Sequence, residues 1–452
     1  MENPVAAAQQ EERILILPKR ESIAKRPKTA LVLAGGGARG AYELGVWQAL
    51  REMDISIDVV TGSSIGALNG ALIAYDDFDR CAELWDKITT SQIFAVEVDD
   101  RADLKQKNIL LRWMFVKNFL GRKTPDTSRM KKVLAPYFDE ERLRASPIDY
   151  GVVTVDIAGR KPVERFKEEI PEGKILDYMV ASASVYPAVM PHEIDGVKYI
   201  DGGFADNLPY GLAMRKKPDR LIAVDLEAPG IHDRNGVRAL DGTIYIKSGW
   251  DLGPTLLFET KLIRRNARLG YLDTLKAFSA LYGHRYAFLW KDREGFALLS
   301  ARLDEALGRF GHEKTKSPVE ATLKKLAAGA VTSRVRGMLE GRESALACAE
   351  MAGEIFSVDP LKIYDKQVFD NRLADECRAV ALPPEAADKP MEKLEALFAK
   401  LVTEARPVRA KRAAQLLRAM ERQGDDLGFL AEAAIWTEEF FAALYLLLMG
   451  IE

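Results

Sequence analysis

The stretch LVLAGGGARGAYELGV, residues 31 to 46, passes from an apolar run into a loop rich in glycine. Gly35, Gly37 and Gly40 have the G-x-G-x-x-G spacing of a dinucleotide-binding turn. In such a site the second strand ends in an acidic residue that binds the ribose hydroxyls. Here the second apolar run, residues 57 to 60, is followed by TGSSIGALNGA instead. The sequence therefore disfavours a dinucleotide site.

The segment TGSSIGA places Gly62, Ser64 and Gly66 in the G-x-S-x-G spacing, at the point where an expected strand gives way to an expected helix. This context is typical of a nucleophile elbow, in which small flanking residues permit a strained turn that exposes the serine hydroxyl. Ser64 is therefore the candidate nucleophile. The alternative is a tight turn in which Ser63 or Ser64 only caps the helix.

The glycine loop has a second possible use beside such a serine. Gly35, Gly36 and Gly37 follow the first expected strand, so in a parallel sheet their loop lies at the same edge as Ser64. Acyl transfer through a serine develops negative charge on the carbonyl oxygen, and the N–H groups of a glycine loop can approach that oxygen closely. We expect these glycines to form an oxyanion hole.

The nucleophile needs a base, and histidine is the usual one. The sequence has four histidines: His192, His232, His284 and His312. The last three follow Ser64 in the order of an α/β-hydrolase triad, but none lies in a recognisable loop at a strand end. A histidine-triad esterase stays open as an alternative, and it predicts loss of activity when one of these three residues is changed.

An acid stands out more clearly, in KYIDGGFADNLP. An expected strand runs directly into Asp201, Gly202 and Gly203, and the two glycines permit a sharp bend that leaves the carboxylate beside a reacting group. An ordinary β-turn with Asp201 capping it is the alternative. An exposed aspartate, with a pKa near 3.9, is a weak base at neutral pH, but burial beside apolar groups raises that pKa.

Taken together, GGGARG, GSSIG and DGG, with ASASVYPAVMP at residues 181 to 191 and DNLP at residues 206 to 209, resemble the patatin-like phospholipases. The resemblance covers about residues 29 to 230. It implies a three-layer α/β/α patatin-like fold with a mainly parallel central sheet. It also implies a lipid acyl hydrolase of the phospholipase A or lysophospholipase type, which cleaves carboxylic esters of glycerolipids through an acyl-enzyme.

Carried over residue by residue, the resemblance makes Ser64 the nucleophile, Asp201 the base and the glycine loop at residues 35 to 37 the oxyanion hole, with no cofactor and no metal. It adds six supporting residues: Arg39, Gly62, Gly66, Gly202, Gly203 and Asn207. Arg39 could support the loop or lie near a lipid phosphate, and we favour support. Asn207 is expected to pin the Asp201 loop. Besides the histidine-triad esterase, two rivals remain: a transacylase with the same dyad and a nucleotide-binding module that uses GGGARG for phosphate.

The pattern along the 452 residues predicts three parts. Residues 1–28 are a flexible tail, residues 29–315 the catalytic α/β domain and residues 316–452 a helical C-terminal region. The expected strands are TALVLA, IDVV, YGVVTVDI, KYI, RLIAVDL and GTIYI. The expected helices are residues 41–52, 65–75, 80–88, 175–184 and 258–281.

Composition and charge bear on location and partners. Three widely spaced cysteines, a polar N-terminus and no apolar run of roughly 18 residues favour a cytoplasmic protein. Two stretches could contact a membrane peripherally: the basic and aromatic residues 104–132, and the basic residues 406–422 with the apolar residues 440–451. For both, packing against the protein core is the alternative. The net charge of -2 gives no reason to expect nucleic acid, and the oligomeric state stays open.

Overall fold

The structure is a computed structural model that describes residues 26–94, 96, 101–121, 124–309, 343–382, 405–423 and 437–451, without the side chains of residues 239, 304–309, 416–423 and 437. The chain divides into two compact units, Met1–Ala280 and Leu281–Glu452. The boundary that the sequence predicts at residue 315, most of the predicted N-terminal tail and His312 lie outside the described residues. The predicted domain limits therefore stay predictions.

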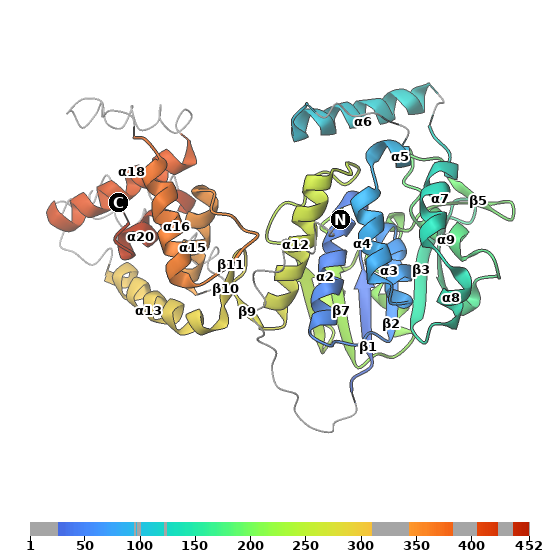
Figure 1. Ribbon diagram of the computed structural model, residues 1–452, viewed down its shortest axis with the longest axis horizontal. Helices are drawn as coiled ribbons and strands as arrows, with labels where there is room; N and C mark the ends of the chain where they lie inside the picture. Colours follow the sequence, from blue (N-terminus) through green and yellow to red (C-terminus); the bar gives the residue numbers. More distant parts are fainter. Residues whose placement is uncertain are drawn as a thin grey trace, which may run out of the picture. The chain divides into compact units, whose positions relative to one another are not determined.

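The first unit is built on an eight-stranded mixed sheet (Figure 1). Its strands are β1 (Thr29–Leu33), β2 (Val59–Ser63), β3 (Asp149–Asp156), β4 (Lys161–Phe166), β5 (His192–Ile194), β6 (Val197–Asp201), β7 (Arg220–Asp225) and β8 (Thr243–Lys247). The order is β5-β6-β3-β2-β1-β7-β8, with β4 beside β3. The five central strands from β3 to β8 run parallel, and β4, β5 and β6 add antiparallel pairs. The predicted α/β fold with a mainly parallel sheet is confirmed.

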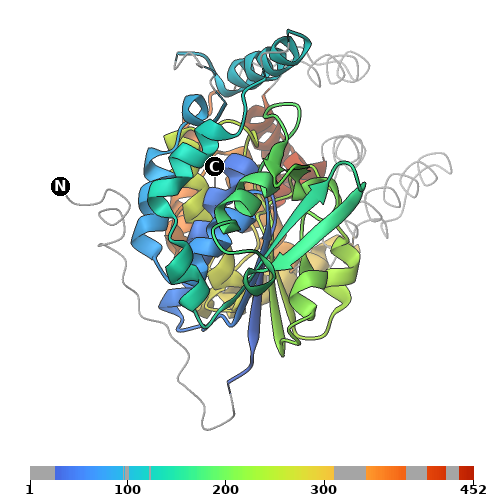
Figure 2. The same cartoon turned by 90° about the vertical axis from the view of Figure 1, so that its right-hand side faces the viewer.

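Helices cover both faces of this sheet (Figure 2). Tyr150 of β3 lies beside Val60 of β2, and its hydroxyl donates to the carbonyl of Ala67 in helix α3. The next residue of β2, Thr61, donates instead to the carbonyl of Pro209, where helix α10 begins. Because successive strand residues point to opposite faces, α3 and α10 lie on opposite sides of the sheet. This is the expected three-layer arrangement.

The helices of this unit are α2 (Ala41–Glu52), α3 (Ile65–Ala74), α4 (Phe78–Lys87), α5 (Thr90–Phe94), α6 (Leu104–Leu120), α7 (Ser128–Leu134), α8 (Glu140–Ala145), α9 (Ile175–Ser182), α10 (Tyr210–Met214), α11 (Arg234–Ala239) and α12 (Thr260–Ala277). Helices α2, α3, α4, α9 and α12 correspond to the five predicted from the sequence, with ends that differ by a few residues. Two short 3-10 turns, Gly37–Gly40 and Gly202–Phe204, carry the glycine motifs.

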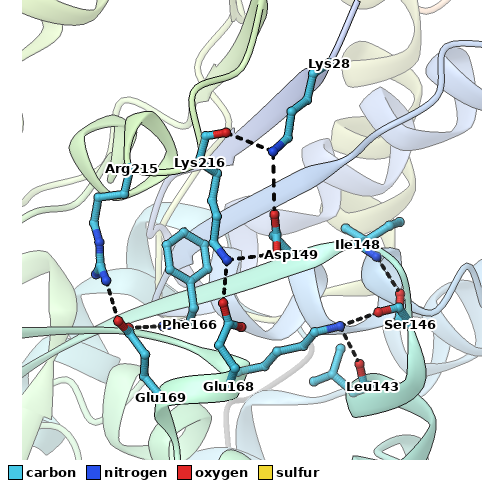
Figure 3. A network of polar contacts seen from close by, with 11 residues as sticks. Lys28, Leu143, Ser146, Ile148, Asp149, Phe166, Glu168, Glu169, Arg215 and Lys216 are labelled. Carbon is cyan, nitrogen blue, oxygen red and sulfur yellow. Dashed lines mark hydrogen bonds and ion pairs between the residues drawn. The ribbon is translucent and has the colours of Figure 1, made fainter.

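A polar network joins the amino ends of β1 and β3 (Figure 3). The ammonium of Lys216 donates to Asp149 at 2.9 Å and also pairs with Glu168. The ammonium of Lys28, just before β1, donates to the main-chain carbonyl of Lys216 at 2.8 Å. Ser64 and the glycine loop follow the carboxyl ends of β2 and β1. This network therefore stabilises the opposite end of the strands, away from those residues.

The second unit is mainly helical, as predicted for the C-terminal region. Its described helices are α13 (Arg293–Arg309), α15 (Ser344–Ile355), α16 (Lys366–Ala379), α18 (Arg406–Gln423) and α20 (Thr437–Leu448). It also holds a small sheet of β9 (Leu281–Tyr282), β10 (Ala287–Leu289) and β11 (Ile363–Tyr364), which the sequence did not predict.

The apolar C-terminal run packs inside this second unit. Residues 440–446 of α20 are buried, and α20 contacts α15 and α18. The guanidinium groups of Arg406 and Arg409 on α18 pair with Glu439, and Arg406 also pairs with Glu438. This stretch therefore follows the alternative of a helix packed on a core. Within the described part of the chain, no helix has both the length and the apolar character needed to span a bilayer.

The crossing of α2 and α12 generates a stability prediction. A Cβ atom added at Gly45 of α2 would overlap the carbonyl of Ala267, and the backbone on both sides leaves no room to move. We expect Gly45→Ala to lower the free energy of unfolding by roughly 2 kcal/mol. Gly211→Ala is the control, because that exposed position has open space around its Cβ, and we expect a gain of about 0.5 kcal/mol. Urea denaturation followed by circular dichroism measures both, and equal midpoints for the two variants would contradict the prediction.

Candidate active site

Ser64 lies on a strained turn between β2 and α3. Its backbone has φ 52° and ψ -122°, and its side chain makes no capping hydrogen bond to the helix. A Cβ at Gly62 would overlap the backbone of Gly66, so the turn can close only with glycine there. These features are those of the expected elbow, and they do not fit the alternative in which Ser64 caps α3.

A second serine holds this turn. The N–H of Ser64 donates to the hydroxyl oxygen of Ser182 at 2.9 Å, and that hydroxyl donates to the carbonyl of Val153 at 2.5 Å. Ser182 is fully buried at the end of α9, so its position is fixed by packing. It therefore ties the strained turn to β3, the neighbouring strand.

Asp201 ends β6 and is buried beside Ser64. The N–H of Gly203 donates to its carboxylate at 2.8 Å, and the Ser64 hydroxyl lies close enough to interact with it. Burial raises the pKa of Asp201 to about 6, and these two groups oppose that rise. At neutral pH the carboxylate is thus ionised, yet it is more basic than an exposed aspartate.

The glycine loop is held by Asn207. The N–H of Gly35 donates to the main-chain carbonyl of Asn207 at 3.0 Å, and the side-chain amide of Asn207 donates to the carbonyl of Gly35 at 3.1 Å. Gly37 has φ +55°, a conformation that favours glycine. Among the described residues, no acceptor is recorded for the N–H groups of Gly36 and Gly37. These two amides can therefore receive a ligand oxygen, whereas that of Gly35 is already bonded.

Arg39 braces the same loop. Its guanidinium donates to the carbonyls of Gly253 at 2.7 Å, Leu226 at 3.1 Å and Glu227 at 2.8 Å. It also lies 3.7 Å from the carboxylate of Asp251. Its donors are thus directed at the backbone of the loops that follow β7 and β8.

One cavity of about 190 Å³ brings the predicted residues together. Ser64, Asp201, Asn207 and the glycines at residues 35 to 37 all line it. The rest of its wall is mainly apolar: Ile65, Leu68, Ile88, Ile93, Phe94, Met130, Leu134, Ala183, Val185, Ala228, Pro229, Thr255, Leu256 and Phe258. A hydroxyl, a carboxylate and free amides at one end of an apolar cavity suit a ligand that has a polar reacting group and an apolar body.

The described histidines lie elsewhere. His192 is buried against Thr127 at 2.7 Å and Asp177 at 3.1 Å, and burial lowers its pKa. His232 is half-buried, and His284 is an exposed residue of the second unit. None of these three lines the cavity.

Sequence reasoning missed Ser182 and most of the apolar wall. Ser182 falls within ASASVYPAVMP, a segment that marked the family resemblance, but nothing in its spacing indicated a contact with Ser64. The wall residues come from α3, α5, α7 and the segments that follow α4, α9, β7 and β8, which are distant in sequence. Thr255, in the segment that follows β8, accepts the N–H of Ala38 at 2.7 Å and so positions the glycine loop as well.

The cavity lies at the carboxyl ends of β1 and β2, where α/β proteins with parallel strands place their ligand sites. Comparison with known proteins indicates which family of α/β proteins this chain resembles. Residues 31–214 match the family model described as patatin-like phospholipase. Over 265 residues the chain is 28% identical to patatin-like phospholipase domain-containing protein 7 of Rattus norvegicus, which covers 57% of this chain and 18% of that protein.

Two further relatives and one solved structure are similar. An uncharacterized NTE family protein of Mycobacterium bovis is 29% identical over 203 residues, 44% of this chain and 49% of that protein. Lysophospholipase NTE1 of Candida glabrata is 27% identical over 252 residues, 55% of this chain and 13% of that protein. The crystal structure of VipD from Legionella pneumophila aligns with a TM-score of 0.37 and 15% identity over 95% of this chain and 92% of that one.

Residues 31–214 of the chain therefore match the patatin-like phospholipase family, and the curated relatives agree with that match. This confirms the family inferred from the glycine, serine and aspartate motifs. The chain spans less than half the length of each of these three curated relatives.

The contact between Ser182 and Ser64 generates a prediction for turnover. We expect Ser182→Ala to reduce kcat about tenfold or more with little change in KM, because the Ser64 turn loses the acceptor of its N–H. Ser184→Ala is a matched control, since this second buried serine lies just beyond α9 and donates to the carbonyl of Val180 in that helix at 2.7 Å. Steady-state ester hydrolysis measures both, and equal kcat values for the two variants would overturn the role given to Ser182.

Burial of Asp201 generates a prediction for stability. Because its pKa is raised in the folded protein, its contribution to stability is full below the unfolded value of 3.8 and is lost as pH rises through about 6. Asp201→Asn cannot ionise and escapes that loss. Relative to wild type, we expect the variant to gain roughly 2 kcal/mol between about pH 4 and about pH 8. Urea denaturation at the two pH values tests this, and a pH-independent difference would be inconsistent with a raised pKa.

Proposed function

We propose that this protein is a lipid acyl hydrolase that cleaves carboxylic ester bonds of glycerolipids through Ser64 and Asp201. The observation that carries the proposal is that Ser64, the buried carboxylate of Asp201 and the glycine loop line one apolar cavity, with the Ser64 hydroxyl near that carboxylate. The name of the family and that of the Candida glabrata relative, a lysophospholipase, support an ester of a lipid as the substrate.

The first half of the proposed reaction forms an acyl-enzyme. Asp201 accepts the hydroxyl proton as the Ser64 oxygen attacks the ester carbonyl, and the amides of Gly36 and Gly37 stabilise the negative oxygen that develops. The proton then passes from Asp201 to the leaving alcohol. The apolar wall holds the fatty acyl chain throughout.

The second half releases the fatty acid. Asp201 accepts a proton from a water molecule, which attacks the acyl carbonyl, and the proton returns to Ser64 as the ester bond breaks. An alcohol in place of that water gives a transacylase with the same residues. Analysis of the products with an added alcohol acceptor distinguishes the hydrolase from the transacylase. The proposal also predicts that the protein acts in the cytoplasm, at a membrane surface.

The test compares wild type, Ser64→Ala and Asp201→Asn on a chromogenic medium-chain ester and on phospholipid vesicles, with folding checked by circular dichroism. We expect both variants to lose activity by at least about a hundredfold, since each removes a group that takes part in bond formation or proton transfer. Added chelator is expected to change nothing. Activity retained by folded Asp201→Asn would contradict the dyad, and His232→Gln, His284→Gln and His312→Gln would then test the histidine alternative.

The pH profile gives a second check. Because Asp201 must be ionised to accept a proton, we expect kcat/KM of the wild type to rise with pH through about 6, the pKa that burial gives this carboxyl. Initial rates on the soluble chromogenic ester over the acid range measure the profile. A profile that is flat across this range would argue against Asp201 as the base.

A further inference from the structure

Helix α6 carries an exposed apolar stripe that nothing in the proposed chemistry requires. Ile109, Trp113, Val116 and Leu120 are exposed by 68%, 57%, 56% and 75%. Their spacing of four, three and four residues places them on one face of the helix. Apolar side chains scattered singly over a surface are ordinary, but four aligned on a single helix form a continuous strip.

The opposite face of α6 is packed against the rest of the first unit. Lys107, Leu111 and Phe115 are buried, and the ring of Phe115 lies 5.2 Å from that of Phe94, a residue of the cavity wall. The ammonium of Lys107 pairs with Glu259 at 3.3 Å. A helix that is apolar on both faces normally has both faces buried. Here the first unit covers one face of α6, and we expect another binding partner to cover the exposed strip.

The charges on α6 indicate what that partner is. Lys105 and Arg112 flank the strip on one side and Lys117 on the other, and the segment from 104 to 120 contains no aspartate or glutamate. Among the described residues, no carboxylate is recorded beside Lys105 or Arg112. An apolar strip between rows of cations suits a bilayer with anionic headgroups. A second copy of the same helix would bring like charges together.

The basic helix of the second unit shows the contrasting case. On α18, Arg406 and Arg409 are neutralised by Glu438 and Glu439, and the apolar face of α20 is buried. In the first stretch that the sequence marked as a membrane candidate, Lys105, Arg112 and the apolar strip of α6 are thus exposed. In the second, these two arginines are paired and residues 440–446 are buried.

The place of α6 in the fold adds a functional reason. The helix lies across the end of the unit at which β1 and β2 finish, the end that carries Ser64 and the glycine loop (Figures 1 and 2). Through Phe115 and Phe94, its inner face contacts the wall of the cavity. A bilayer against the outer face would therefore lie close to the cavity.

We propose that α6 docks the protein on an anionic lipid surface, with Ile109, Trp113, Val116 and Leu120 inserted at the boundary between headgroups and acyl chains. This deepens the proposed function and rests on it, because docking places the substrate bilayer beside Ser64. In this proposal α6 binds the lipid surface, and the residues of the cavity carry out the reaction.

The test separates docking from catalysis by using Ser64→Ala as the background, so that vesicles stay intact. Co-sedimentation with phosphatidylcholine vesicles, with and without phosphatidylglycerol, measures the affinity. We expect binding that requires phosphatidylglycerol and weakens with salt. Adding Ile109→Gln and Val116→Gln is expected to reduce the affinity about tenfold or more.

A matched control comes from the second unit. Leu298 and Val368 are exposed by 70% and 56%, nearly the same as Ile109 and Val116. Leu298→Gln with Val368→Gln therefore removes an equal amount of exposed apolar side chain away from α6, and we expect vesicle binding to be unchanged. For the charges, Lys105→Gln with Arg112→Gln is expected to lower affinity for the anionic vesicles about tenfold, while Lys105→Arg with Arg112→Lys keeps it.

Several results would overturn the docking role. These are absence of vesicle binding by folded Ser64→Ala, equal affinity of the α6 variant and its control, or conversion of a dimer to a monomer by the α6 substitutions without an effect on vesicles. The last result would assign the strip to a second copy of the chain.

Failure of the proposed function has a different signature. With Ser64 intact, the Ile109→Gln and Val116→Gln variant should hydrolyse the soluble ester at the wild-type rate but phospholipid vesicles more slowly. An inactive wild type that still binds anionic vesicles would refute the hydrolase and leave the docking surface standing.

Discussion

The left-handed backbone of Ser64 is the constraint on which the site depends. A residue with a side chain at φ 52° costs of order 1–3 kcal/mol and persists only where its surroundings enforce it. Here the enforcement comes from three sides. Gly62 and Gly66 pack backbone to backbone, and the Ser182 hydroxyl accepts a hydrogen bond from the Ser64 N–H. The Ser182 hydroxyl in turn donates a hydrogen bond to the carbonyl of Val153 in β3. The strain turns the hydroxyl out of the helix and towards the Asp201 carboxylate.

The second requirement is a carboxylate that has little water around it. Asp201 is buried, and it accepts a hydrogen bond from the N–H of Gly203, with the Ser64 hydroxyl close by. Among the described residues, no cation perturbs the pKa of Asp201. The absence of a compensating cation preserves its basicity, because a lysine or arginine nearby would return the pKa towards that of a weak base.

The sequence predicted those parts of the molecule that depend on local pattern. Strand-to-glycine transitions located Ser64, Asp201 and the loop at residues 35 to 37, and helix α2 was predicted at residues 41 to 52, where it lies. Long-range contacts were not predictable in this way. The link between Ser182 and Ser64 joins residues 118 positions apart, and the raised pKa of Asp201 depends on burial by several elements. The short strands β9, β10 and β11 consist of two or three residues each, too few for a periodic pattern.

Helix α6 shows how a pattern can be ambiguous for a physical reason. Its apolar residues lie on two opposite faces, so the sequence has no single polar side from which to orient the helix. Only the packing of Leu111 and Phe115 against the rest of the first unit decides which face of α6 is exposed to solvent.

Asn207 bonds to Gly35 twice, through its own carbonyl and through its side-chain amide. It follows Asp201 by six positions, and between them Gly203 accepts the N–H of Ile231 while Asn207 donates its own N–H to the carbonyl of that residue. The glycine loop and the loop that bears the Asp201 carboxylate are therefore joined through Asn207. Under the proposed function, an acyl group that enters the cavity meets these two loops as one piece, and the apolar wall is the part left to adapt to it.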